Sequence, residues 1–282
     1  MKKTRIALVQ MQAETGNVKG NLAKIADYTE RAAKDKVDVI CFPELSITGY
    51  NKIKGYLTPE TIPGPSADYI SSLACRLRVI ILAGLPEKSS SERPFISQMV
   101  AFPEGKVAVY RKTHLGKTEV SAFSPGDKIP VFQGETANFG IGICWDMHFP
   151  ELSTVLALKG AEIIFAPHAS PKVMGNRRES WLKYLTARAY DNGLYVAACN
   201  LVGTDGESKE FCGGALVLDP KGNIVAESFT GEEGMLVADL DPDLVNNMRQ
   251  KERKVMSDSF YLDFRRPELY SDLRRKSIFK KD

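Results

Sequence analysis

Short apolar runs alternate with segments whose apolar residues recur every three to four positions, and this alternation continues through most of the chain. The runs have the length and composition of buried β-strands, and the intervening segments have the period of amphipathic helices. The predicted strands cover residues 6–9, 37–42, 79–83, 139–143, 162–166 and 194–198. The predicted helices cover residues 22–33, 67–77, 152–158 and 181–189. This order of elements favours an α/β fold.

Turn signals at the ends of these elements support the pattern. Ser66 is suited to cap the second helix, and Gly193 is suited to end the fourth. A last strand at 235–240 and a helix from Pro242 complete the series. Turn residues also separate two pairs of apolar runs, which predicts hairpins. These hairpins join residues 96–102 to 107–111 and residues 215–218 to 224–226.

No repeat, low-complexity linker or step in composition divides the chain. We therefore predict one domain of two sheets covered by helices, spanning residues 1–255. The basic and aromatic segment 256–282 is predicted to form a C-terminal arm that packs on the domain or on a second subunit.

Three reactive side chains stand where predicted strands end. Glu44, Lys112 and Cys144 each come directly or almost directly after an apolar run. Because the carboxyl ends of neighbouring strands meet at one edge of a sheet, we expect an acid, a cation and a thiol in one pocket. Cys144 also precedes a helical pattern, whose first N–H groups are free to face a reacting group.

These three groups have complementary roles in acyl transfer. A thiol with an ordinary pKa of roughly 8.5 needs a base or a cation to be a good nucleophile at neutral pH. Glu44 would be that base, and Lys112 with the Trp145 N–H would stabilise an oxyanion. Each residue also has a structural alternative: a buried thiol, a carboxylate bound to backbone N–H groups, and a solvated ammonium group. A Cys144–His168 dyad is the second arrangement considered, since His168 also follows a predicted strand.

Composition narrows the possible partners and the compartment. The net charge of +3 gives no reason to expect nucleic acid or a membrane surface as a partner. Five cysteines without a Cys-x-x-Cys pair indicate reduced thiols in a cytoplasmic protein. Only three histidines are present, so no metal site is expected. No apolar run approaches the length of a transmembrane helix.

Three motifs occur in a fixed order along the chain. They are Phe42-Pro43-Glu44-Leu45, Tyr110-Arg111-Lys112-Thr113-His114-Leu115 and Gly142-Ile143-Cys144-Trp145-Asp146. Together they make the sequence similar to the nitrilase superfamily of carbon–nitrogen hydrolases over nearly its whole length. The resemblance implies a four-layer α-β-β-α sandwich that forms a homodimer or larger homo-oligomer through helices and the C-terminal arm.

The resemblance also implies roles for single residues. Glu44 would be the general base, Lys112 the oxyanion stabiliser and Cys144 the nucleophile. Glu119 matches a second glutamate that positions the substrate nitrogen and Lys112; alternatively, it is an exposed loop acid. The reaction would pass through a thioester and release ammonia, with no cofactor and no metal.

The branch within the superfamily follows from the residues around the cysteine. The stretch around Asp146 resembles the amidase and N-carbamoyl-amine hydrolase branches, and Pro167-His168-Ala169-Ser170 resembles the latter, which places His168 and Ala169 near the substrate. Arg177 or Arg178 could bind a substrate carboxylate, although both could also be exposed. A small linear amide is the leading substrate class. An N-carbamoyl amine, a nitrile and a non-catalytic scaffold are the alternatives.

Overall fold

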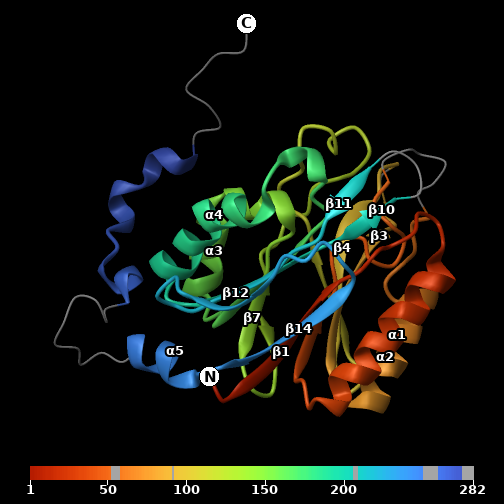
Figure 1. Cartoon of the computed structure of the whole chain (residues 1–282). Coiled ribbons are helices and arrows are strands. Elements are labelled where there is room, and N and C mark those ends of the chain that lie inside the picture. Colours follow the sequence, from red (N-terminus) through yellow and green to blue (C-terminus); the bar gives the residue numbers. More distant parts are fainter. Residues whose placement is uncertain (52–57, 91, 206–208, 250–259, 275–282) are drawn as a thin grey trace, which may run out of the picture.

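The computed structural model describes residues 1–51, 58–90, 92–205, 209–249 and 260–274. Two six-stranded sheets face each other, and helices cover the outer face of each, as Figure 1 shows. The fold is thus the predicted four-layer α-β-β-α sandwich. The thiols of Cys41 and Cys199, one from each sheet, approach to 3.9 Å across the central interface.

The first sheet has the strand order β14-β1-β2-β3-β4-β5. Its strands are β1 (Thr4–Gln10), β2 (Val39–Cys41), β3 (Ile80–Glu87), β4 (Phe95–Ala101), β5 (Val107–Arg111) and β14 (Gly234–Leu240). Strands β1, β2 and β3 are parallel, whereas β4 and β5 form the predicted antiparallel hairpin. The last strand, β14, runs antiparallel to β1 with Thr4 opposite Leu240.

The second sheet has the order β13-β12-β9-β8-β7-β6. Its strands are β6 (Phe132–Gln133), β7 (Asn138–Ile141), β8 (Ile163–His168), β9 (Tyr195–Asn200), β12 (Ala215–Leu218) and β13 (Ile224–Ser228). Strands β7, β8 and β9 are parallel, and β12 and β13 form the second predicted hairpin. Sequence periodicity did not indicate β6 or the small ribbon of β10 (Val202–Thr204) and β11 (Glu210–Cys212), because these strands are too short.

Helices α1 (Val18–Lys34) and α2 (Pro65–Leu77) cover the first sheet, and α3 (Pro150–Leu158) and α4 (Arg177–Asn192) cover the second. Gly193 ends α4 in the left-handed conformation, as predicted. The prediction that Ser66 caps α2 is wrong. Gly64 is the N-cap, and Ser66 instead donates from both its N–H and its hydroxyl to the carboxylate of Glu60.

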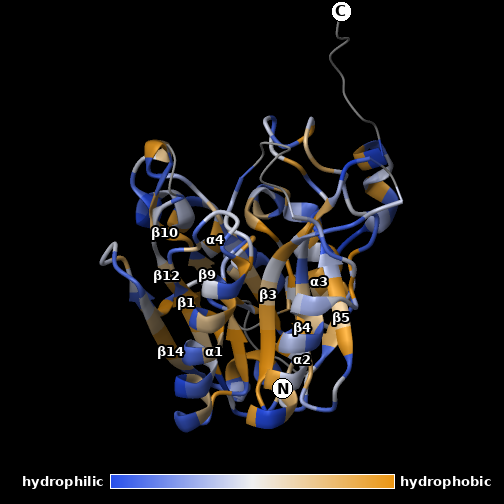
Figure 2. Cartoon of the chain, turned by 90° about the vertical axis from the view of Figure 1, so that its right-hand side faces the viewer, coloured by the Kyte–Doolittle hydropathy of each residue, from blue (hydrophilic) through white to orange (hydrophobic). Residues whose placement is uncertain are grey.

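The core lies between the sheets and beneath the helices. Every residue of β3, β8 and β9 is buried, which explains why these strands are continuous apolar runs without alternation. Figure 2 shows the hydrophobic strands inside and hydrophilic residues on the outer faces of the helices. No helix in the described ranges is both long and apolar enough to cross a membrane.

Short elements follow the last strand. Helix α5 (Pro242–Met248) is followed, within residues 260–274, by the 3₁₀ turns η5 (Tyr261–Phe264), η6 (Pro267–Leu269) and η7 (Ser271–Arg274). In Figure 1 these turns run along the outside of the molecule on the side of α3 and α4. The Tyr261 hydroxyl lies 3.0 Å from the Tyr190 hydroxyl of α4. The predicted domain boundary at residue 255 lies outside the described residues, so the division into domain and arm stays a prediction.

Candidate active site

The parallel strands of both sheets end at the same side of the sandwich, and a cavity of about 290 Å³ opens there. Its walls come from the segments that follow β5, β7 and β8 and from the start of α4. The lining residues are Tyr50, Lys112, Gly116, Lys117, Thr118, Glu119, Cys144, Trp145, His148, His168, Ala169, Ser170, Pro171, Met174, Arg177, Tyr184 and Lys209.

Cys144 is the first residue of a short 3₁₀ helix, η2 (Cys144–His148), and Gly142 and Ile143 separate it from β7. The predicted strand 139–143 ends at Ile141 because the chain leaves the sheet to make this turn. The backbone of Cys144 has a φ of 47°, which is an uncommon conformation for a residue with a side chain. The turn leaves the thiol half-buried at the cavity wall, with the Ser170 hydroxyl 3.5 Å from the sulfur.

Lys112 is buried between two carboxylates. Its Nζ donates to Glu44 Oε1 at 2.7 Å and to Glu119 Oε1 at 2.9 Å. Lys112 and Glu44 are each 1% exposed and Glu119 is 4% exposed, so this ion pair is shielded from water. The sequence-predicted acid, cation and second glutamate therefore meet, although Glu44 lies behind the cavity wall.

Backbone and hydroxyl groups fix the two carboxylates. The Ala169 N–H donates to Glu44 Oε2 at 3.0 Å. Glu119 accepts hydrogen bonds from the Tyr50 hydroxyl at 2.8 Å and from the Gly116 N–H at 2.7 Å. Both carboxylates thus have fixed orientations around the ammonium group, as a pre-organised site requires.

Burial and charge set the protonation states. Burial raises the pKa of Glu44 to about 7, although Lys112 opposes this shift. Burial followed by the charge of Glu44 raises the pKa of the Cys144 thiol to about 12, against the effects of Lys112 and Ser170. Burial lowers the pKa of Lys112, but Glu44, Cys144 and Glu119 outweigh it and raise the pKa above its usual range. At neutral pH the site therefore holds a neutral thiol, a charged lysine and a glutamate close to its midpoint.

His168 and Ala169 line the cavity, as the sequence predicts, but their polar groups are bound to other parts of the chain. Nδ1 of His168 lies 2.7 Å from the carbonyl of Ala166, and Nε2 lies 3.4 Å from the Tyr184 hydroxyl. Burial followed by the charge of Arg177 lowers the pKa of His168 to about 3. Because both ring nitrogens contact other groups, the described contacts give no support to a Cys144–His168 dyad. The Ala169 N–H is bound to Glu44, so it is not free for a substrate oxygen.

Arg177 and Arg178 have opposite environments at the start of α4. Arg178 lies on the surface, where Nε donates to Glu227 Oε2 at 2.7 Å. Arg177 is only 8% exposed and lines the cavity. Its Nε and Nη2 are buried and have no hydrogen-bond partner among the described residues. The geometry thus brings Arg177, and not Arg178, to the cavity.

Sequence reasoning missed several groups at this site. Tyr50 and Ser170 contact Glu119 and Cys144 respectively, and Tyr184 contacts His168. Only Ser170, which directly follows Ala169, offered a sequence signal; the inward positions of Tyr50 and Tyr184 depend on the folded chain. Trp145 lines the cavity as expected and is 39% exposed. Among the described residues, no three His, Cys, Asp or Glu side chains gather as a metal ion would require.

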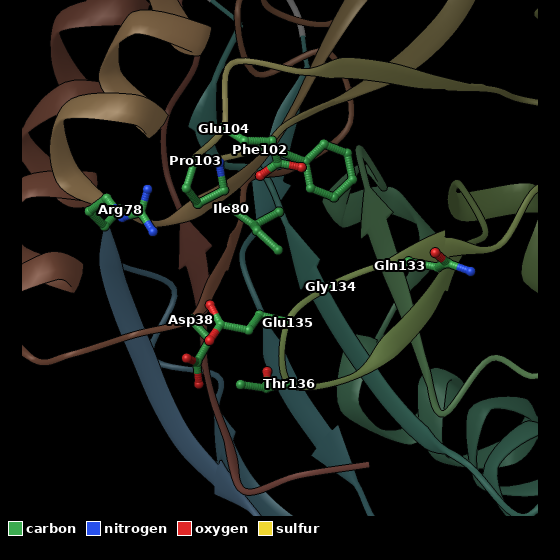
Figure 3. A pocket seen from close by; sticks show the side chains of 10 residues that line it. All are labelled: Asp38, Arg78, Ile80, Phe102, Pro103, Glu104, Gln133, Gly134, Glu135 and Thr136. Carbon is green, nitrogen blue, oxygen red and sulfur yellow. The ribbon is translucent and has the colours of Figure 1, made fainter.

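A second cavity, of about 340 Å³, lies at the opposite side of the sandwich, where Asp38 precedes β2. Figure 3 shows its lining, which includes Asp38, Arg78, Glu104 and Glu135 but no thiol. Arg78, Glu104 and Glu135 are exposed, and Asp38 is half-buried. Asp38 accepts a hydrogen bond from the Arg5 N–H at 2.7 Å, which is a structural contact.

Comparison with known proteins agrees with this geometry. Residues 5–250 match the family model described as Carbon-nitrogen hydrolase. An omega-amidase of Saccharomyces cerevisiae is 32% identical, over 88% of this chain and 90% of its own length. A solved amidase from Nesterenkonia sp. AN1 is 28% identical, with a TM-score of 0.82 over 96% of this chain and 99% of that one. A variant of that amidase, 29% identical with a TM-score of 0.80 over 94% of this chain and 95% of its own, shows the acetamide moiety of fluoroacetamide covalently added at its active-site cysteine.

Proposed function

The chain belongs to the carbon–nitrogen hydrolase family, and from that premise we propose that it hydrolyses small linear amides through a thioester on Cys144. One observation carries the proposal: the Lys112 ammonium group, held between Glu44 and Glu119, shares a cavity wall with a half-buried thiol. This arrangement supplies a nucleophile, a proton acceptor and an oxyanion partner at one place.

In the first half of the reaction the Cys144 sulfur attacks the amide carbon and its proton passes to Glu44. A raised pKa of about 7 suits Glu44 both to take and to return a proton near neutral pH. The Lys112 ammonium group and the Trp145 N–H hold the oxyanion. Glu44 then protonates the leaving nitrogen, the C–N bond breaks, and ammonia departs from the thioester.

In the second half Glu44 takes a proton from water, and the oxygen of that water attacks the thioester carbon. The C–S bond breaks, the sulfur recovers the proton from Glu44, and the carboxylic acid leaves. Glu119 holds Lys112 in place and offers its second oxygen to the substrate N–H. His168 and Ala169 shape the wall beside the reacting carbon.

The proposal extends to the far end of the substrate. A buried guanidinium group without a counter-charge is costly, and the two unpartnered atoms of Arg177, Nε and Nη2, lie on the same edge of the group. That edge matches the two oxygens of a carboxylate. We therefore expect the substrate amide to carry a carboxylate at its other end.

The nucleophilic thiol is tested by intact-mass spectrometry after incubation with fluoroacetamide, because the attacking sulfur displaces fluoride and keeps the acetamide moiety as a stable thioether. We expect one adduct on Cys144, no adduct in Cys144→Ala, and an unchanged adduct in Cys75→Ala, which removes an exposed thiol. An ammonia assay on small amides then measures turnover. The amide assignment would be wrong if the enzyme releases no ammonia from amides but releases ammonia and carbon dioxide from an N-carbamoyl amine.

The substrate carboxylate is tested with the two neighbouring arginines. Arg177→Met should raise KM for a monoamide of a dicarboxylic acid by about 10- to 100-fold, as expected for a lost hydrogen bond to a charged group. A neutral amide of equal length should be unaffected. Arg178→Met, the matched control, should change neither KM. Equal losses on both amides in Arg177→Met would exclude carboxylate binding.

Two further expectations from the sequence belong to the proposal. Self-association is supported by apolar side chains that residues 260–274 expose, since Phe264 is 76% exposed and Leu273 is 62% exposed. A cytoplasmic location is supported by five free cysteines, two of them facing each other unbonded in the core. Self-association is tested by light scattering, which compares the molecular mass of the full chain with that of Phe264→Ser.

A further inference from the structure

Asp146 is a fully buried carboxylate two residues after the thiol, in the 3₁₀ helix η2. Its Oδ2 accepts a hydrogen bond from the Ile143 N–H at 3.0 Å, which closes the turn immediately before Cys144. The same oxygen accepts a second hydrogen bond from the Tyr110 hydroxyl at 2.7 Å. One oxygen atom therefore joins the turn that carries the thiol to strand β5.

The other oxygen of Asp146 binds the chain on the far side of Lys112. Oδ1 accepts hydrogen bonds from the Thr113 hydroxyl and from the His114 N–H, both at 2.8 Å. Nδ1 of His114 lies 3.0 Å from the same oxygen, and its ring stacks on Phe149 with ring centroids 3.9 Å apart.

These contacts surround Lys112 in the sequence. Tyr110 comes two residues before it, and Thr113 and His114 come directly after it. The two chain segments belong to different sheets, because β5 lies in the first and β7, which precedes Cys144, lies in the second. Asp146 thus bridges the sheets at the point where the thiol and the ammonium group must face one substrate carbon.

We propose that Asp146 is a positioning residue that fixes the separation of the Cys144 sulfur and the Lys112 ammonium group. This inference rests on the proposed function, in which both groups act on the same carbon. Two features require such a bridge. The φ of 47° at Cys144 is costly and persists only where the surroundings determine it. A displacement of about 1 Å between reacting groups can cost about 100-fold in rate.

Asp146→Asn tests the bridge with little change of shape. A carboxylate accepts hydrogen bonds on both oxygens, whereas an amide presents N–H donors on one side. That side would face either the pair Tyr110 and Ile143 or the pair Thr113 and His114, all of which donate to Asp146. One half of the bridge must then open, whichever way the amide is turned.

We expect Asp146→Asn to lower kcat by about 100-fold, with KM within about threefold of the parent value. Alkylation of Cys144 by iodoacetamide at fixed pH should also slow several-fold, because Lys112 favours the thiolate through its charge. The alkylation rate separates the two levels of inference. Suppose that Cys144 is alkylated faster in the parent enzyme than in Asp146→Asn, but that the parent enzyme hydrolyses no amide. This result would overturn the proposed function and leave the positioning role of Asp146 intact.

Asp219 offers a matched control far from the cavity. It is also a buried carboxylate that holds a turn, and it accepts from the Lys221 N–H at 2.8 Å and the Asn223 N–H at 2.9 Å. Asp219→Asn should lower the melting temperature and leave kcat and alkylation unchanged. If Asp146→Asn also lowers the melting temperature and leaves kcat and the alkylation rate unchanged, Asp146 is only structural.

Should Asp146→Asn fail to fold, Tyr110→Phe removes a single hydrogen-bond donor to Asp146. An unchanged kcat and an unchanged alkylation rate of Cys144 in that variant would equally overturn the proposal.

Discussion

The two ends of the sandwich both hold a cavity with charged walls, yet they differ in how the charges are held. At the end where the parallel strands finish, Glu44, Lys112 and Glu119 are buried and bound to one another. At the opposite end, Arg78 and Glu135 are exposed beside a cavity of about 340 Å³. The two cavities thus have similar volumes, although only one of them has linked charges.

The difference teaches that volume is a poor guide to chemistry in this fold. Solvent-exposed charged side chains keep their hydration, and ion pairs between them contribute little to stability. A buried ammonium group with two carboxylates is expensive unless its geometry is fixed, and the folded chain supplies that geometry from several strand ends. Buried charged side chains that bind one another therefore identify the reactive end of the sandwich.

Of the replacements that test this difference between the two ends, Lys112→Met should have the largest effect on activity and stability. Lys112→Met should lower kcat/KM by about 100- to 1,000-fold, as for a lost oxyanion partner. It should also lower the free energy of unfolding by about 3–5 kcal/mol, because two buried carboxylates lose their counter-charge. Steady-state kinetics and denaturant unfolding measure the two effects. Lys117→Met, at an exposed position of the same cavity, should change neither, and unchanged stability in Lys112→Met would show that the buried charges are not interdependent.

The pH profile should show the raised pKa of Glu44. Glu44 must be deprotonated to accept the thiol proton, so kcat/KM should rise with pH through about 7 and level off above it. Below the midpoint the rate should fall about tenfold per pH unit, as for a single ionisation. Glu44→Gln should lose turnover at every pH. A flat profile between pH 5 and pH 8 would contradict the role of Glu44 as base.

Replacing a charge at the opposite end should have the smallest effect. Arg78→Ala should change the free energy of unfolding by no more than about 0.5 kcal/mol, as for an ordinary surface substitution. It should leave kcat/KM within about twofold of the parent value, because Arg78 lies far from the thiol along the strands. A large loss of activity in this variant would mean that the two ends communicate.

Much of the fold followed from periodicity, because the central strands are buried on both faces and therefore appear as apolar runs. The convergence of Glu44, Lys112 and Cys144 followed from their places after strands. Short strands such as β6 escaped notice, since two residues carry no period. The cap at Ser66 was wrong because the helix already begins at Pro65 and the nearby carboxylate of Glu60 accepts from the Ser66 hydroxyl.

The details of the site could not be predicted to the same extent. Arg177 and Arg178 are identical neighbours, and only the exact start of α4 decides which one turns inward. Asp146 belonged to a known motif, but its partners come from strand β5 and the segment after it, far away in the sequence. Side-chain direction at a helix start and contacts across sheets depend on the whole fold, which local sequence does not encode.

The pairing of β1 with β14 has a consequence for biogenesis. Strand β1 is flanked in the finished sheet by β2 and by β14, which is synthesised more than 200 residues later, with Thr4 opposite Leu240. During synthesis one edge of β1 therefore stays without its hydrogen-bond partner until residues 234–240 emerge. An exposed strand edge is a template for pairing with other chains, so a nascent chain stalled before residue 234 presents such an edge.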